Sequence, residues 1–577
     1  MTYLNDNKTT NSNMKKQILG MACTLAALAA GAQTPATYQV PVSEAQEPMH
    51  TGKYQPTWES LREYEVPEWF RDAKFGIWAH WGPQCVEGSG DWMAREMYME
   101  GNYKYNYHRE HYGHPSEFGF KDVLPLFRAE KWNPEQLIKF YKEECGAEYF
   151  FALGNHHDNF DLWDSQYQEW NSKRIGPKRD ILAEWSAAAK KYGLPFGVSF
   201  HADHAWTWYE PSRRFDMKGD KRGVKYDGWL TKEDGYKPNA DGTEKWWKGL
   251  DPQNLYAQNH DLSDRTWDNG AIHSQWGWEN GACLPSVDFA TNFYNRTLDA
   301  INRYNPDLIY FDVTVLPFYP VSDAGMKIAA HMYNHHLAAT ATSQKKNSVT
   351  STKTKNPGVV FGKILTDEQK EALVWDVERG APNQIMERPW QCCNCIGDWH
   401  YNTGTYKNNH YKSASTIVKL LVDIVSKNGN MLLSVPLRAD GTFDEKEEAI
   451  LKEFGAWMKV NKESIYATRP WQKFGEGPIA ESTVKINAQG FNDGAYTKAG
   501  SDEIRFTQSK DGRTIYATAL AWPTNMTMSI KSLADKKIKS VELLGYGKVK
   551  FTQSSTVLTV ALPEKCNTIA PVLKVKM

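Results

Sequence analysis

The sequence predicts an α/β protein: a (β/α)8-like TIM barrel followed by a small antiparallel β-sandwich. Three observations predict this fold class. Up to about residue 468, apolar runs of strand length alternate with helical patterns, and such continuous runs indicate parallel strands buried on both faces. Beyond residue 469, segments such as TIYATALAW (514–522) alternate apolar and polar residues, which indicates antiparallel strands. The 577 residues leave room for a barrel of ~250 residues or more and a second domain.

The barrel elements follow one another in chain order. Helices are expected at 132–146, where Asn133 is the N-cap, at 180–193 and at 288–305. Residues 416–436 are expected to form a helix that leads into the last barrel strand. The earlier strands are expected at FGIWAHWG (75–82), AEYFFALGNHH (147–157), PFGVSFHA (195–202) and PDLIYFDVTVLP (306–317).

Segments outside the regular pattern complete the predicted organisation. Residues 1–33 are expected to be a bacterial signal peptide with an upstream extension, because two lysines, a short apolar stretch and the cleavage site Ala30-Gly31-Ala32 follow Met14. We therefore expect a periplasmic or secreted protein. Residues 202–285 form a long insertion with eight tryptophans, which we expect to be an ordered wall or lid over the site. The other segments are a linker (34–55), the barrel (56–468) and the β-sandwich (469–577).

Composition excludes some partners and favours others. Lys and Arg total 68 against 69 Asp and Glu, a net charge of -1, so nucleic acid is not an expected partner. The apolar run after Met14 is too short for a comfortable membrane span. The 23 Trp and 29 Tyr supply flat amphipathic rings, which suit a ligand with apolar and hydroxylated faces, such as a carbohydrate. Nothing in the residues indicates an oligomeric state.

Polar residues follow four of the expected strands directly. In TIM barrels the active site lies at the C-terminal ends of the strands, so the fold places these residues in the site. Asp312 closes an apolar run and is the candidate nucleophile, although a helix cap or an arginine pair would also explain it. The other strands end on His80, on the pair His156 and His157, and on His201. Adjacent histidines on an extended segment point to opposite sides, which favours hydrogen bonds to sugar hydroxyls over chelation of one metal ion.

Motifs in this chain resemble, in order, the family 29 glycoside hydrolases, the α-L-fucosidases. The resemblance covers about residues 65–470 and is to an atypical, secreted bacterial member. It implies a TIM barrel, a retaining double displacement, and no metal or other cofactor. The motifs are WFRDAKFGIWAHWG (69–82), HHDNFDLWDSQYQEWNS (156–172), PDLIYFD (306–312), IGDWHYN (396–402), LVDIVSKNGNMLLSVP (421–436) and GAWMKVNKESIYATRPW (455–471).

The resemblance implies roles for single residues. The family nucleophile falls on Asp312. Two positions depart from the family pattern, since Tyr310 and Met97 stand where Trp is usual. Together with the strand ends, the expected substrate-binding residues are His80, Glu96, His156, His157, Trp163, His201 and Tyr310.

The acid/base position departs further. Many relatives have a Glu between a Trp and a Cys, where this chain has Gln391, and an amide cannot protonate a leaving group at neutral pH. The nearest carboxylic acids are Glu378 and Glu387. We favour Glu378 because it follows an apolar stretch, where burial favours the protonated acid, although Arg379 beside it would also suit a surface ion pair.

We therefore predict a retaining exo-glycosidase that releases terminal α-L-fucose, or a closely related L-sugar, with Asp312 as nucleophile and Glu378 as acid/base. One alternative is a non-catalytic carbohydrate-binding relative, because the usual acid is Gln391. Such a protein would turn over an aryl glycoside no faster than its Asp312→Asn variant. The other is a metal-dependent barrel hydrolase, sensitive to chelators, whose ligands would be His80, His201, His204 and Asp312.

Overall fold

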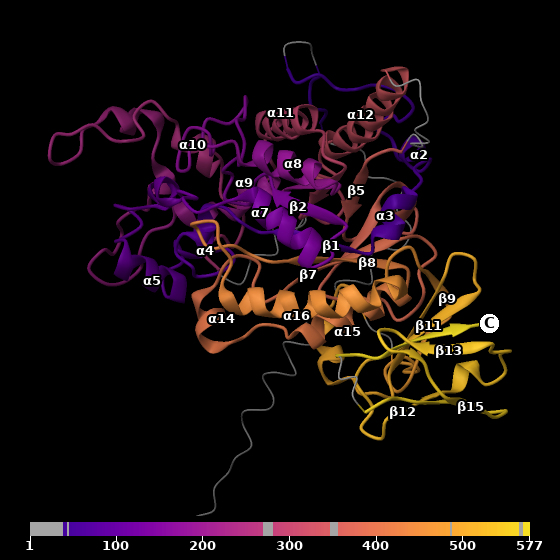
Figure 1. Ribbon diagram of the computed structural model, residues 1–577. Helices are drawn as coiled ribbons and strands as arrows, with labels where there is room; N and C mark the ends of the chain where they lie inside the picture. The colour runs from indigo at the N-terminus through magenta and orange to yellow at the C-terminus, as the bar shows by residue number, and fades with distance from the viewer. Residues whose placement is uncertain are drawn as a thin grey trace, which may run out of the picture.

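Eight parallel strands form a closed barrel at the centre of the structure, a computed structural model (Figure 1). The structure describes residues 38–42, 46–268, 278, 281–346, 356–484, 487–564 and 569–577. The barrel strands are β1 Phe75–Ala79, β2 Tyr149–Leu153, β3 Phe196–Phe200, β4 Leu308–Phe311, β5 Val359–Gly362, β6 Val374–Glu378, β7 Trp390–Cys395 and β8 Gly429–Ser434. Each strand pairs with the next along the chain, and β1 pairs with β8 to close the barrel. The predicted fold class is confirmed.

Strand burial explains why the apolar runs do not alternate. Every residue of β1, β2, β3 and β4 is buried, because one face of each strand fills the barrel and the other packs on the surrounding helices. Gly76 of β1 is directly opposite Tyr149 of β2, and a Cβ at Gly76 would collide with the tyrosine ring. Glycine at this position therefore leaves room for a large side chain inside the barrel.

Helices surround the barrel, and those predicted from the sequence are present. The 132–146 helix begins as expected, with the Asn133 side chain accepting a hydrogen bond from the Gln136 amide at 3.1 Å. It continues as a π-helix over Phe140–Glu144 and ends before Gly146, whose φ of 80° favours glycine. The main outer helices are α7 Pro134–Lys139, α8 Ile181–Lys191, α11 Val287–Tyr304, α12 Ala324–Lys346, α13 Gln369–Ala372, α15 Ala414–Ser426 and α16 Glu445–Asn461.

The tryptophan-rich insertion packs against the loop after β1. Its described part contains short helices, among them α9 Ala205–Trp208 and α10 Pro252–Tyr256. The Tyr98 hydroxyl donates to Asp227 at 2.7 Å, and the Tyr105 hydroxyl donates to Asp216 at 2.6 Å. These buried hydrogen bonds fix the loop after β1 on the insertion. Residues 269–277, 279 and 280 of the insertion lie outside the described residues.

Two antiparallel sheets form the C-terminal region, as predicted. The six-stranded sheet has the order β14-β13-β17-β11-β10-β9, and the three-stranded sheet has the order β12-β16-β15. They enclose a separate core that includes Trp471 and Phe506. The sheets lie beside α15 and α16 (Figure 1), and the buried Asp423 of α15 pairs with Arg505 of β10 at 2.6 Å. The strands are β9 Arg469–Glu476, β10 Ile504–Gln508, β11 Thr514–Ala519, β12 Thr527–Ile530, β13 Ser540–Leu543, β14 Gly547–Lys548, β15 Phe551–Gln553, β16 Leu558–Ala561 and β17 Val572–Lys576.

The N-terminal expectations are covered only in part. The expected signal peptide, residues 1–33, lies outside the described residues. The described part of the expected linker packs on α12, where the Tyr54 amide donates to the Asn334 side chain at 3.0 Å. Within the ranges that the structure describes, no helix has the length and apolar character needed to cross a membrane.

Candidate active site

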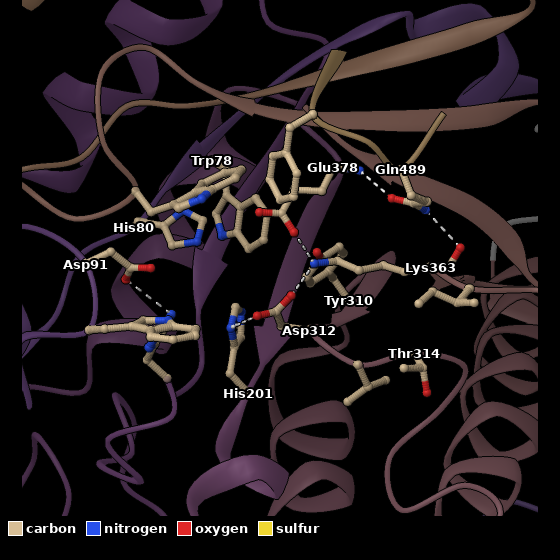
Figure 2. A pocket seen from close by; sticks show the side chains of 16 residues that line it. Trp78, His80, Asp91, His201, Tyr310, Asp312, Thr314, Lys363, Glu378 and Gln489 are labelled. Atoms are coloured by element: carbon tan, nitrogen blue, oxygen red, sulfur yellow. Dashed lines mark hydrogen bonds and ion pairs between the residues drawn. The ribbon is translucent and has the colours of Figure 1, made fainter. Parts of the chain in front are cut away.

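A cavity of about 440 Å³ opens at the C-terminal ends of the barrel strands (Figure 2). Six of the nine residues predicted for the site line it: Asp312, Glu378, His80, His156, His201 and Tyr310. They come from β1, β2, β3, β4 and β6 or from the residues that directly follow these strands. The other lining residues are Trp78, Asp91, Trp92, Val313, Thr314, Lys363, Ile364, Trp399, Gln489 and Phe491.

A buried lysine joins the two predicted catalytic carboxylates. Lys363 follows β5, and its Nζ donates to Glu378 Oε2 at 2.7 Å and also to Asp312 Oδ1 (Figure 2). One ammonium nitrogen therefore contacts both carboxylates. The Asp312 and Glu378 side chains are thereby brought to the same part of the cavity.

The groups around Asp312 keep its carboxylate ionised. Burial alone would raise its pKa, but Lys363 and a hydrogen bond with His157 Nε2, 3.2 Å from Asp312 Oδ2, hold the pKa well below its usual range. His201 Nδ1 lies 3.8 Å from the same carboxylate oxygen. Conversely, the two carboxylates raise the pKa of Lys363 despite its burial. Asp312 is therefore charged at neutral pH, as a nucleophile requires.

Buried imidazoles form one wall of the cavity. Burial, reinforced by neighbouring histidines, lowers the pKa of His80, His156 and His201 well below the usual range. The three rings are therefore neutral at neutral pH, and each has one donor and one acceptor nitrogen. His80 Nδ1 lies 2.8 Å from Ser434 Oγ, and His156 Nδ1 lies 2.7 Å from Gln84 Nε2. These contacts fix the ring orientations of His80 and His156 in a wall suited to hydroxyl groups.

Aromatic rings form the apolar part of the lining. Trp78 makes an edge contact with Tyr310, with ring centroids 4.7 Å apart, and Trp399 lies 5.1 Å from His80. Trp92 also lines the cavity, beside Asp91 on the loop after β1. The lining thus combines hydrogen-bonding imidazoles with aromatic rings, which matches a ligand with hydroxylated and apolar faces.

Three residues predicted to bind substrate lie outside the cavity lining. His157 lies behind Asp312, with Nδ1 2.9 Å from the His201 carbonyl oxygen. Trp163 is buried and donates to Asp299 Oδ2 at 2.8 Å. Glu96 pairs with Lys104 at 2.9 Å, whereas Asp91, earlier in the same loop, lines the cavity. The positions of His157 and Trp163 therefore indicate that they support the site from outside the cavity lining.

Gln391 does not line the cavity. It is fully buried in β7, accepts a hydrogen bond from the Tyr149 hydroxyl at 3.0 Å and donates to Asp376 at 2.9 Å. Its amide is therefore part of the barrel interior. Of the two acid/base candidates, Glu378 lines the cavity and Glu387 is exposed outside the lining.

Sequence reasoning missed several lining residues. Lys363 could have been found in the same way as Asp312, because it is a charged residue that directly follows an apolar strand, β5. Asp91, Trp92 and Trp399 lie on loops, where no periodicity singles them out. The insertion 202–285 is expected to form a wall or lid over the site, but within its described part, 202–268, 278 and 281–285, no residue lines the cavity.

The imidazole cluster fits hydrogen bonding better than a metal ion. Nitrogens of His156, His157 and His201 lie within 4.8 Å of one another. Both nitrogens of His157 face oxygen acceptors, and His156 Nδ1 is bonded to Gln84. A catalytic zinc site with three histidines needs a lone pair from each ring. The alternative ligand set with His80, His204 and Asp312 is not among the groups of close ligand atoms in the described ranges.

Two carboxylates at the C-terminal end of a parallel barrel, with imidazole and indole walls, define a glycoside hydrolase site. Comparison with known proteins narrows this class. The family model described as alpha-L-fucosidase matches residues 42–463, and the model of the alpha-L-fucosidase C-terminal domain matches residues 498–576. The chain belongs to the α-L-fucosidase family.

Individual relatives agree with this assignment. The chain is 25% identical to the plasma alpha-L-fucosidase of Homo sapiens over 508 residues, which cover 87% of this chain and 86% of the relative. It is 25% identical to the tissue alpha-L-fucosidase of Rattus norvegicus over 511 residues, with the same shares covered. Among solved structures, the Thermotoga maritima alpha-fucosidase in complex with fucose has the same fold, with a TM-score of 0.61, 23% identity, and coverage of 90% of this chain and 100% of that chain.

Proposed function

We propose that this glycosidase is a retaining exo-α-L-fucosidase in which Asp312 is the nucleophile and Glu378 the acid/base. The main support is the contact of Lys363 Nζ with both carboxylates. Two carboxyl groups that share one ammonium lie close together, in keeping with the ~5 to 5.5 Å separation of retaining enzymes. The names of the relatives support fucose as the released sugar.

The proposed reaction has two displacements. Asp312 attacks the anomeric carbon, the glycosidic bond breaks, and Glu378 gives its proton to the leaving oxygen. Glu378 then takes a proton from water, which attacks the fucosyl ester and releases Asp312 and α-L-fucose. The neutral rings of His80, His156 and His201 would bind the sugar hydroxyls, while Trp78, Trp399 and Tyr310 face its apolar side.

Hydrolysis of an aryl α-L-fucoside in the presence of azide tests both roles. We expect Asp312→Ala to lose activity by about a thousandfold or more, because the covalent step is lost. Glu378→Ala should retain the first step on this activated substrate, and azide should restore turnover, giving fucosyl azide of retained configuration. Azide with Asp312→Ala should give inverted product or none.

Glu387→Ala is the matched control, since it removes a nearby exposed glutamate outside the cavity lining. It should keep wild-type activity and show no azide effect. If azide instead rescued Glu387→Ala with retained configuration, and left Glu378→Ala unchanged, the assignment of the acid/base would be wrong.

We also propose that the chain is exported, as the lysines, apolar stretch and small residues after Met14 suggest. N-terminal sequencing of the mature protein should show cleavage after Ala32. A mature protein that retained this segment would contradict export by this signal.

A further inference from the structure

A loop of the C-terminal region reaches the cavity of the barrel. Gln489 and Phe491 precede β10, yet both line the cavity together with Glu378 and Lys363. Figure 2 shows Gln489 beside Glu378 and Lys363. The barrel alone therefore does not complete the site, and residues 487–493 supply part of its wall.

The Gln489 side chain is bonded to the backbone of two catalytic strands. Its Oε1 accepts from the Glu378 amide at 3.1 Å. Its Nε2 donates to the carbonyl oxygens of Lys363 at 2.9 Å and Asp376 at 2.7 Å. One amide thus joins the end of β5 to β6, which gives both Lys363 and Glu378 a fixed backbone.

Further contacts anchor the loop on the barrel. The buried Asp493 lies 3.3 Å from Arg379 Nε and 3.4 Å from Lys412 Nζ. Its backbone amide donates to the Arg379 carbonyl oxygen at 3.1 Å. The Ala488 carbonyl oxygen approaches Gly380 so closely that a Cβ at Gly380 would collide with it. Phe491 is therefore presented from a loop that is held on both sides.

Phe491 is exposed although it lies in this anchored loop. It is 55% exposed and has a left-handed backbone, with φ of 51°, a conformation that costs a residue other than glycine on the order of 1 kcal/mol. Its ring packs on the Arg379 guanidinium, with 5.7 Å between them. Arg379, which follows the proposed acid/base Glu378 in sequence, thus contacts a largely solvent-exposed aromatic ring at the cavity.

We propose that Phe491 forms the leaving-group subsite and binds a pyranose ring, the sugar from which fucose is released. This inference rests on the proposed function, because Glu378 as acid/base defines the side on which the leaving oxygen departs. A pyranose has an apolar C–H face that can lie on an aromatic ring, while its hydroxyl edge stays in contact with water. The Arg379 guanidinium contacts the Phe491 ring and adds to its support.

The test compares two substrates that differ in the leaving group. An α-L-fucosyl disaccharide has a pyranose leaving group, whereas the leaving group of α-L-fucosyl fluoride is a fluoride ion, which is too small to reach an aromatic subsite. We expect Phe491→Ala to lower kcat/KM for the disaccharide about five- to tenfold, the value of one aromatic contact, and to lower it much less for the fluoride. Phe491→Trp should restore most of the disaccharide rate.

Tyr546→Ala is the matched control, because Tyr546 is 56% exposed in the same region but outside the cavity lining. It should leave both rates unchanged. An equal loss on both substrates in Phe491→Ala would mean that the loop supports catalysis without binding the leaving group, and no loss on the disaccharide would mean that nothing binds there. Either result would contradict the proposed subsite but not the proposed fucosidase activity, provided that the wild type hydrolyses the fluoride. A wild type inactive on the fluoride would overturn the fucosidase proposal itself.

Discussion

At the scale of single residues, Lys363 is the charge that does most to keep Asp312 ionised. It is the first of the charges that hold the pKa of Asp312 down against burial. Lys363→Met removes the ammonium and keeps a side chain of similar length. We expect the pKa of Asp312 to rise, so that the nucleophile becomes protonated at a higher pH. The acid limb of kcat/KM should move to higher pH, and kcat/KM at neutral pH should fall about a hundredfold.

Two further variants distinguish loss of the Lys363 charge from nonspecific effects of replacing a lysine. Lys363→Arg keeps a cation beside Asp312, so its acid limb should stay closer to that of the wild type. Lys370→Met removes a lysine that pairs with Asp367 on the surface and should change neither limb. An acid limb that did not move in Lys363→Met would show that the histidines alone keep Asp312 ionised.

At the scale of elements, strand ends were the part of the site that the sequence predicted well. An apolar run that stops at a polar residue identified His80 and Asp312, and their barrel positions follow from the parallel fold. Loop residues such as Asp91 and Trp92 could not be found this way, because a loop conformation depends on contacts made far along the chain. The loop after β1 is fixed by Tyr98 and Asp227, which are 129 residues apart.

Gly380 is an element-scale test of the connection between β6 and the C-terminal loop. Gly380→Ala would place a methyl group against the Ala488 carbonyl oxygen, so β6 or the loop must shift. Glu378 is two residues away, and a small misplacement of a catalytic group is costly. We expect kcat/KM to fall at least about tenfold for fucosyl disaccharide and aryl fucoside. Gly494→Ala, with nothing within 4 Å of its Cβ, should behave as wild type; equal activity of both variants would contradict a fixed loop.

At the scale of the whole molecule, the sequence predicted two domains but not that both form the site. The β-sandwich pattern gives no sign that Gln489 bonds to Glu378, because the two are 111 residues apart and lie in different domains. Burial of Asp423 and Arg505 between α15 and β10 keeps the domains in contact. A role for the C-terminal region in choosing the leaving group therefore becomes visible only from the packed structure.

Stability of the whole molecule should depend on pH through Asp376. This carboxyl lies inside the barrel, accepts from Gln391 at 2.9 Å and from Cys393 at 3.0 Å, and burial raises its pKa to about 6 from 3.8. Since the folded state binds this proton more tightly than the unfolded state, the carboxyl destabilises the fold above pH 6 and ceases to do so as pH falls toward 4. Asp376→Asn removes the titration.

We therefore expect the thermal unfolding temperature of the wild type to rise, relative to that of Asp376→Asn, as the pH falls from 7 to 5. The corresponding change in unfolding free energy should be about 1 to 1.5 kcal/mol, because pH 5 lies only about one unit below the raised pKa. Asp535→Asn, which changes an aspartate whose side chain is 75% exposed, should follow the wild type at both pH values. A constant difference between wild type and Asp376→Asn would show that the barrel interior does not titrate in this range. In that case the buried carboxyl would be a fixed hydrogen-bond partner of Gln391. Stability in this range would then depend on other buried acids, such as Asp158 and Asp299, whose pKa values burial also raises to about 6.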